Sequence, residues 1–162
     1  MLLTPQEQSV MLVDKRSGHT FFYKPITATD LFSGLSESGH ATLTAMMQSK
    51  HFEPNQQVFA AGDSPRNIYL LDRGHADLID DKRHQMSSTH DLVGPDQLFG
   101  ITEMLSGRNF ETGLRTISPC DFYIIERDDF FAFLHNQPDI CYRLASMIGS
   151  LYSEALRNLK IN

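Results

Sequence analysis

Short apolar runs separated by turn-forming residues occupy residues 55–126 of this chain. Runs such as VFAAGD and IYLLDRG recur about every eight to twelve residues, with Gly, Pro, Asp or Asn between them. Strands at this spacing are typical of antiparallel sandwiches and barrels. The pattern therefore predicts a mainly β fold with flanking helices, built around a small barrel or jelly roll.

A helical pattern precedes these strands. Ser36 is the expected N-cap of the helix, and Pro54 is expected to end it. Leu43, Met46 and Met47 lie on its apolar side, where we interpret the methionines as core residues rather than ligands.

Two further helices are expected after the strands. Asp128 is the predicted N-cap of a short helix, DFFAFLHNQ, and Pro138 the predicted first residue of a long one. Apolar residues of the long helix alternate at spacings of three and four, as in a coiled-coil seam about two heptads long. The seam either packs on the chain's own barrel or pairs with a second copy in a parallel dimer. It consists of Cys141, Leu144, Ile148, Leu151 and Ala155.

The first 30 residues are ambiguous. The stretches VMLVD and HTFFYKPI are consistent with short strands or an extended arm, and no pattern identifies a partner for either. We therefore predict three parts of the chain: an N-terminal extension at 1–30, the helix and barrel at 31–126, and the two last helices at 127–162.

Composition restricts the classes of function. Twenty acidic against fourteen basic residues give a net charge of −6, without a basic run, which argues against nucleic-acid binding by this chain alone. Cys120 and Cys141 have no CxxC spacing, which suits a reducing cytoplasm. The opening segment has neither the leading positive charge of a signal peptide nor the length of a membrane span. The sequence predicts a cytoplasmic location and no membrane insertion.

Catalytic and metal-binding patterns are weak. His75, His84 and His90 could gather around one hairpin, but their spacing is not that of metal or haem ligands, and we interpret them as surface residues. The serine of GLSES is better placed to cap a helix than to act as a nucleophile. The chain has no P-loop motif. We therefore predict no metal, no cofactor and no enzymatic activity.

Five stretches of the chain carry a resemblance through their order and spacing. They are LFSGLS at 31–36, VFAAGD at 58–63, IYLLDRG at 68–74, GPDQLFG at 94–100 and LRTISPCDFYIIERDDFFAFL at 114–134. Together they make residues 31–160 resemble a cyclic nucleotide-binding domain, in particular the sensor half of Crp/Fnr-type regulators. That family implies a helix, an eight-stranded jelly-roll barrel, a short helix and a long dimerising helix. It also implies a regulatory protein in which occupancy of a ligand cradle shifts the last two helices.

The cradle of that family has the form F-G-E-x-A-L, followed by P-R-A-A/S-T. Its Glu binds the ribose 2′-hydroxyl, and its Arg and the adjacent small residue hold the cyclic phosphate. This chain retains the Phe-Gly pair but has Ile, Phe and Glu at the three ligand-binding positions. The candidate ligand-binding residues are Phe99, Gly100, Ile101, Glu103, Arg108, Phe110, Glu111 and Thr112.

These departures predict an altered cradle. Each lost charge-assisted hydrogen bond costs about 1.5 to 3 kcal/mol, so loss of the Arg alone weakens cyclic nucleotide binding about ten- to a hundredfold. In the alternative hypothesis the chain is a small-molecule sensor. Arg108 and the backbone N–H groups after Gly100 then hold the ligand, and Glu103 replaces the missing acid. Asp96, at a turn where the family has Gly, is expected to preserve that turn.

Crp/Fnr regulators continue into a helix-turn-helix domain, whereas this chain ends at Asn162. We therefore expect no direct promoter binding. The resemblance implies a homodimer, and we expect it to act through contact with another protein.

Overall fold

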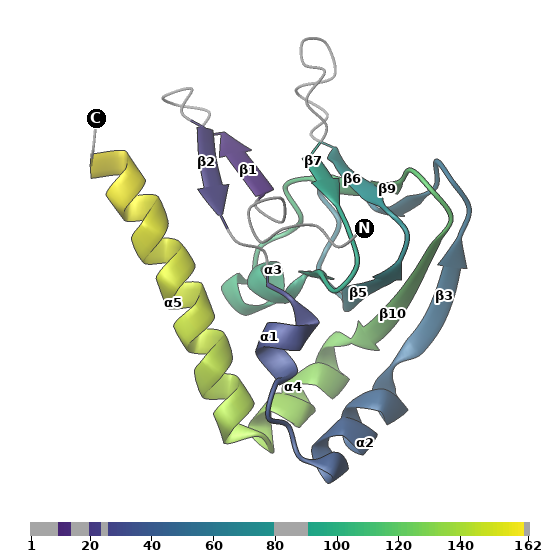
Figure 1. Cartoon of the computed structure of the whole chain (residues 1–162), viewed down its shortest axis with the longest axis vertical. Coiled ribbons are helices and arrows are strands. Elements are labelled where there is room, and N and C mark those ends of the chain that lie inside the picture. The colour runs from purple at the N-terminus through teal and green to yellow at the C-terminus, as the bar shows by residue number, and fades with distance from the viewer. Residues whose placement is uncertain (1–9, 14–19, 24–25, 80–90, 161–162) are drawn as a thin grey trace.

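The computed structural model of the chain describes residues 10–13, 20–23, 26–79 and 91–160. Within them, eight strands form two four-stranded antiparallel sheets (Figure 1). The first sheet has the order β3 (Gln48–Phe52), β10 (Cys120–Glu126), β5 (Asn67–Arg73) and β8 (Leu98–Phe99). The second has the order β4 (Gln57–Phe59), β9 (Gly113–Thr116), β6 (Ala76–Ile79) and β7 (Asp91–Val93). The predicted jelly-roll architecture with flanking helices is confirmed.

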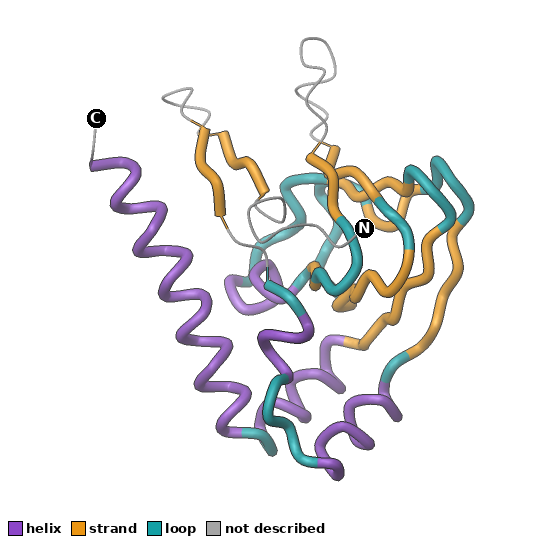
Figure 2. The backbone as a smooth tube through the Cα atoms, viewed as in Figure 1, coloured by secondary structure: helices purple, strands orange, loops and turns teal. Residues whose placement is uncertain are grey.

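Five helices accompany the sheets in the described part of the chain, and Figure 2 shows them below and to the left of the two four-stranded sheets. They are α1 (Ala28–Phe32), α2 (Glu37–Met46), α3 (Ile101–Ser106), α4 (Arg127–His135) and α5 (Pro138–Lys160). The long α5 begins at the predicted proline. No helix in the described ranges has the length and apolar character needed to cross a membrane.

Two hydrophobic clusters hold these layers together. The barrel cluster joins the two sheets, and the helix cluster joins the first sheet to the helices. The barrel cluster consists of Phe52, Phe59, Leu71, Ala76, Val93, Phe110, Leu114, Cys120 and Phe122. The helix cluster consists of Ile26, Leu31, Phe32, Leu43, Ile68, Leu98, Ile101, Met104, Ile125, Phe130, Phe133, Leu134, Ile140 and Leu144.

The first predicted helix is confirmed at its start and wrong at its end. The Ser36 hydroxyl accepts a hydrogen bond from the Gly39 N–H, as an N-cap does. However, α2 ends at Met46, and Gln48–Phe52 form β3 rather than more helix. Four of these five strand residues are exposed, so their burial pattern does not reveal a strand. These residues form a strand because they pair with β10.

The predicted N-cap of α4 is also wrong, by two residues. The cap is Glu126, the last residue of β10, and Asp128 lies in the first helical turn together with Asp129. Acidic residues favour the first turn because its free N–H groups carry partial positive charge. The end of the strand determines the exact cap, which local composition does not show.

The two apolar stretches near the N-terminus each contain a described strand. β1 (Val10–Val13) and β2 (Thr20–Tyr23) pair with each other as an antiparallel hairpin. The hairpin lies between the barrel and α5 in Figure 1, and β2 contacts α5 while β1 contacts β7. The predicted boundary between residues 30 and 31 falls inside α1.

Candidate ligand cradle

The cradle begins where β8 passes into α3. Gly100 adopts a φ of 100°, and a Cβ atom there would lie 2.7 Å from the Asn67 carbonyl oxygen. Both facts require glycine at this turn. The short helix α3 follows Gly100, and Gly107 ends it in a second left-handed conformation. The matched Phe99-Gly100 pair therefore preserves the cradle's backbone shape.

Phe110, at the position of the family's Arg, points into the barrel. Its side chain is 5% exposed, and its ring stacks on Phe59 with 4.0 Å between centroids and 19° between planes. Its N–H donates to the Asp63 carbonyl at 3.0 Å, and its own carbonyl accepts from the Gly62 N–H at 2.7 Å. These backbone hydrogen bonds fix the segment between α3 and β9, and so they fix the orientation of the Phe110 ring.

The stacked pair belongs to a larger aromatic group. Phe59 also contacts Tyr69 at 5.2 Å and Phe99 at 6.4 Å between centroids. The Phe110 Cζ atom lies 3.4 Å from where a Cβ on Gly100 would be, so the ring reaches the start of α3. The interior of the barrel beneath the cradle is consequently apolar and filled by aromatic rings.

The acidic candidates lie together, and the basic one lies on the surface. Burial raises the pKa of the half-buried Glu103 carboxyl, and the negative charge of Glu111 raises it further. Arg108 is exposed, although its backbone N–H donates to the Glu103 carbonyl at 3.0 Å. Glu111 is exposed and Thr112 half-buried. The charged candidates of the cradle are thus a half-buried Glu103, an exposed Glu111 and an exposed Arg108.

Ile101, at the position of the family's Glu, faces away from the aromatic group. It is 2% exposed and joins the helix cluster together with Met104 of the same helix. That cluster includes Phe130 of α4 and Leu144 of α5. The cradle helix therefore shares one hydrophobic cluster with the two C-terminal helices.

The predicted seam of α5 is divided between two environments. Leu144 is buried and Ile148 half-buried, and both pack in the helix cluster of their own chain, whereas Cys141 is exposed. The side chains of Leu151 and Ala155 lie outside the described residues. Leu144 and Ile148 therefore follow the first of the two interpretations, packing on the chain's own domain.

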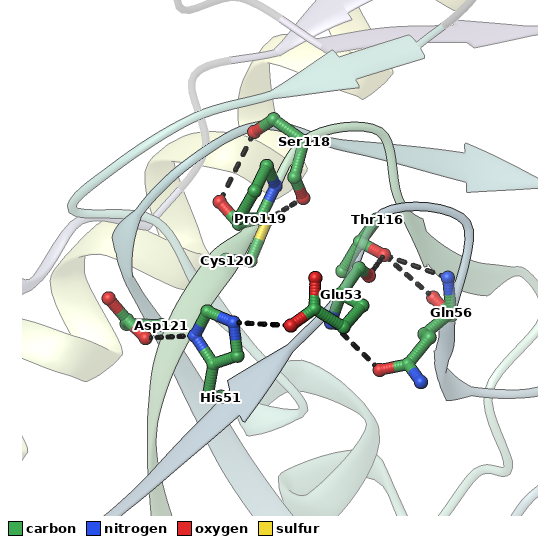
Figure 3. Close-up of polar contacts among 8 residues, drawn as sticks. All are labelled: His51, Glu53, Gln56, Thr116, Ser118, Pro119, Cys120 and Asp121. Atoms are coloured by element: carbon green, nitrogen blue, oxygen red, sulfur yellow. Dashed lines mark hydrogen bonds and ion pairs between the residues drawn. The ribbon is translucent and has the colours of Figure 1, made fainter.

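A polar cluster that the sequence did not predict joins β3 to β10 (Figure 3). His51 Nδ1 lies 2.7 Å from Asp121 Oδ1, and His51 Nε2 lies 3.3 Å from Glu53 Oε1. The hydrogen bond to Asp121 is the largest cause of the raised pKa of His51, and Glu53 also contributes. His51 and Asp121 are 70 positions apart and meet only because the strands pair in this register, so no local motif marks them.

This cluster makes stability depend on pH. A histidine pKa that is higher in the folded state stabilises the fold below the unfolded pKa of about 6.5, and the stabilisation is lost as pH rises through the folded value. We expect His51→Gln to flatten the fall in melting temperature between pH 6 and pH 8. Thermal melts of this variant, with His40→Gln on the exposed side of α2 as control, test the effect. An unchanged pH profile would contradict it.

The histidines considered as ligands do not form a described site. His84 and His90 lie outside the described residues. The carbonyl of His75 accepts a hydrogen bond from the Cys120 thiol at 3.2 Å, and burial raises the pKa of that thiol. Among the residues that the structure describes, no group of three or more His, Cys, Asp or Glu is arranged to hold a metal ion.

The fold agrees with the comparisons to known proteins. The model of the cyclic nucleotide-binding domain family matches residues 49–137, which is more than half of the chain. This chain belongs to the cyclic nucleotide-binding domain family.

Two relatives indicate the range of this family. The cyclic AMP receptor protein of Thermus thermophilus is 22% identical over 125 residues, which cover 77% of this chain and 58% of the relative. The potassium channel AKT1 of Arabidopsis thaliana is 32% identical over 112 residues, which cover 69% of this chain and 13% of the channel. The chain thus spans little more than half of the first relative and a small part of the second.

Solved structures show the same fold. The Thermus thermophilus catabolite activator protein superposes with a TM-score of 0.71 at 22% identity, covering 82% of this chain and 62% of that one. The C-linker and cyclic nucleotide-binding homology domain of zELK channels, crystallised in the presence of cAMP, superposes with a TM-score of 0.62 at 18% identity. It covers 75% of this chain and 60% of that one.

Proposed function

We propose that this chain is a non-enzymatic regulatory module whose cradle is filled by its own aromatic residues and does not bind cyclic AMP in the usual way. The observation that carries the proposal is the buried Phe110 ring stacked on Phe59 at the position of the family's phosphate-binding Arg. Membership of the family supports the regulatory class.

Two separate free-energy costs oppose a cyclic phosphate in this cradle. Loss of the charged donor costs about 1.5 to 3 kcal/mol. Moving the Phe110 ring aside to make room exposes an aromatic side chain, which costs about another 1.5 to 3 kcal/mol. Together these reduce affinity by about two to four orders of magnitude. The nearby carboxylates of Glu103 and Glu111 add repulsion.

The filled cradle has a mechanical consequence under this proposal. Ile101 and Met104 of α3 pack in one cluster with residues of α4 and α5, so the cradle helix and the C-terminal helices have one shared packing arrangement. A ligand shifts such an arrangement only when its affinity for two states differs. With the ring in the cradle, the module holds one arrangement without a ligand.

The alternative is a sensor that binds a cyclic nucleotide or another small molecule through Arg108 and backbone amides. The exposure of Arg108 at the edge of the cradle favours it, because the side chain is available to a ligand. Calorimetric titration with cyclic AMP and cyclic GMP separates the two functions. If the chain is a sensor, Arg108→Ala lowers its affinity for the nucleotide. If the cradle is filled, the nucleotide changes the melting temperature of neither the wild type nor the Arg108→Ala variant.

We further propose that the module is a cytoplasmic homodimer that pairs through α5 and acts on a protein partner. The face of α5 opposite the helix cluster supports this proposal, since it has Tyr142, 77% exposed, and the exposed small residues Ala145 and Gly149 at helical spacing. A Cβ at Gly149 meets no atom within 4 Å of its own chain, so this face has room for another helix.

Light scattering at tens of micromolar tests the dimer. We expect the mass of two chains for the wild type and for Gly149→Ala, and the mass of one chain for Gly149→Arg, because a long charged side chain separates two helices packed at this face. Circular dichroism provides the control that the arginine variant is folded. A wild-type protein that is monomeric at this concentration would contradict the proposal.

A further inference from the structure

We propose that the segment Ile26–Ser33, which contains α1 and is called the α1 strap here, mechanically couples the turn that enters the cradle to helix α5. One end of the strap is hydrogen-bonded to Asp96 and the other to Arg143. The coupling is independent of whether the cradle binds a ligand, and so goes beyond the function proposed above.

The first end of the strap is held by Asp96 through both its backbone and its side chain. The Asp96 carbonyl accepts from the Ala28 N–H at 2.8 Å, and its carboxylate oxygens lie 3.1 and 3.3 Å from the Thr29 nitrogen. Its own N–H donates to the Leu71 carbonyl of β5 at 2.8 Å. Asp96 has a φ of 76°, a conformation in which glycine is favoured. A glycine would make this turn but would leave the Thr29 N–H without the carboxylate.

The second end of the strap is held by Arg143 of α5. Its Nη1 atom donates to the Leu31 carbonyl at 3.2 Å, to the Ser33 carbonyl, and to the Ser33 hydroxyl at 3.0 Å. These carbonyls lie at the C-terminal end of α1, where helices leave acceptors unsatisfied and where positive charge is favourable. Arg143 therefore ties the second turn of α5 to the end of α1.

The middle of the strap is buried but too short to be stable alone. Leu31 and Phe32 are buried in the helix cluster beside Ile140 of α5, and the Phe32 ring meets Phe133 edge to face at 6.2 Å. α1 has only five residues, and an isolated helix of that length does not form in water. Its order depends on contacts at both ends. Loosening one end is therefore expected to loosen the other.

Hydrogen exchange measured by mass spectrometry on the full chain tests the coupling. Asp96→Gly keeps the turn and removes the carboxylate, and we expect it to speed exchange in residues 138–150 of α5 about five- to tenfold, the change for loss of a helix cap. Arg143→Gln is expected to speed exchange in residues 94–98 by a similar factor. The double variant is expected to add little to either single one, since both release the same element.

Controls separate coupling from general destabilisation. Arg73→Gln is the matched control for Arg143→Gln, because the Arg73 side chain is 81% exposed. If Asp96→Gly does not fold, Asp96→Asn replaces it as the variant that changes the carboxylate. Exchange in β10 is expected to stay at the wild-type rate in the single variants. Effects confined to the substituted end, additive effects in the double variant, or an equal increase in β10 would each overturn the proposal.

Discussion

Replacing Phe110 with alanine is expected to lower the free energy of unfolding by about 3 to 5 kcal/mol, the range for removing a buried aromatic side chain. The ring is almost fully buried and stacks on Phe59. Its removal leaves a cavity within the aromatic group. The cavity cannot close freely, because hydrogen bonds hold the backbone around it. Such a loss is a large part of the stability of an ordinary domain.

Urea denaturation followed by circular dichroism measures this effect. Phe131→Ala is the matched control, because that phenylalanine is 36% exposed on α4 and its truncation should cost less. Phe110→Leu, which keeps most of the apolar volume, should lie between alanine and the wild type. A loss below about 1 kcal/mol for Phe110→Ala would show that the ring does not fill the cradle.

Cyclic nucleotide binding is the second large effect. We expect calorimetric titration of the wild-type chain with cyclic AMP or cyclic GMP to give no binding at micromolar concentrations, because the charged donor is missing and the ring fills its place. Micromolar or tighter binding by the wild type would contradict the proposed function.

A designed variant makes this result informative. The double substitution Phe110→Arg and Glu111→Ser introduces the side chains that the family uses for the phosphate. We expect it to bind at least about tenfold more tightly than the wild type, since it restores charge-assisted hydrogen bonds and removes a negative charge. A thermal melt tests whether the variant is folded. A folded variant with no gain in affinity would show that the cradle's backbone, rather than its side chains, excludes the nucleotide.

Much of the barrel was predictable because its strands bury side chains in a regular local pattern. In β5, Ile68 and Leu71 are completely buried, and in β10 so are Phe122 and Ile125, which gives short apolar runs between turns. The order and spacing of those runs also predict the position of the candidate cradle along the chain. Strand β3 lacks such a pattern because its residues are mostly exposed, so the sequence alone predicts the end of a helix there.

The side-chain contacts of the cradle could not be predicted from its amino-acid sequence. Phe110 was identified from its position relative to a motif, but that its ring stacks on Phe59, about fifty positions earlier, depends on how the two sheets face each other. The exposure of Arg108 likewise depends on where α3 ends and how the chain returns to β9.

The sequence by itself determined the class of fold, the family and the candidate residues of the cradle, because strand periodicity, glycine turns and helix caps are local properties of the chain. Only the tertiary structure decided which distant groups meet: the His51–Asp121 pair across β3 and β10, and the Asp96 and Arg143 contacts at the two ends of α1. Hydrogen bonds and ring contacts of this kind depend on distances of a few ångströms between segments far apart in the chain. Those distances are set when the sheets and helices pack, and no local pattern records them.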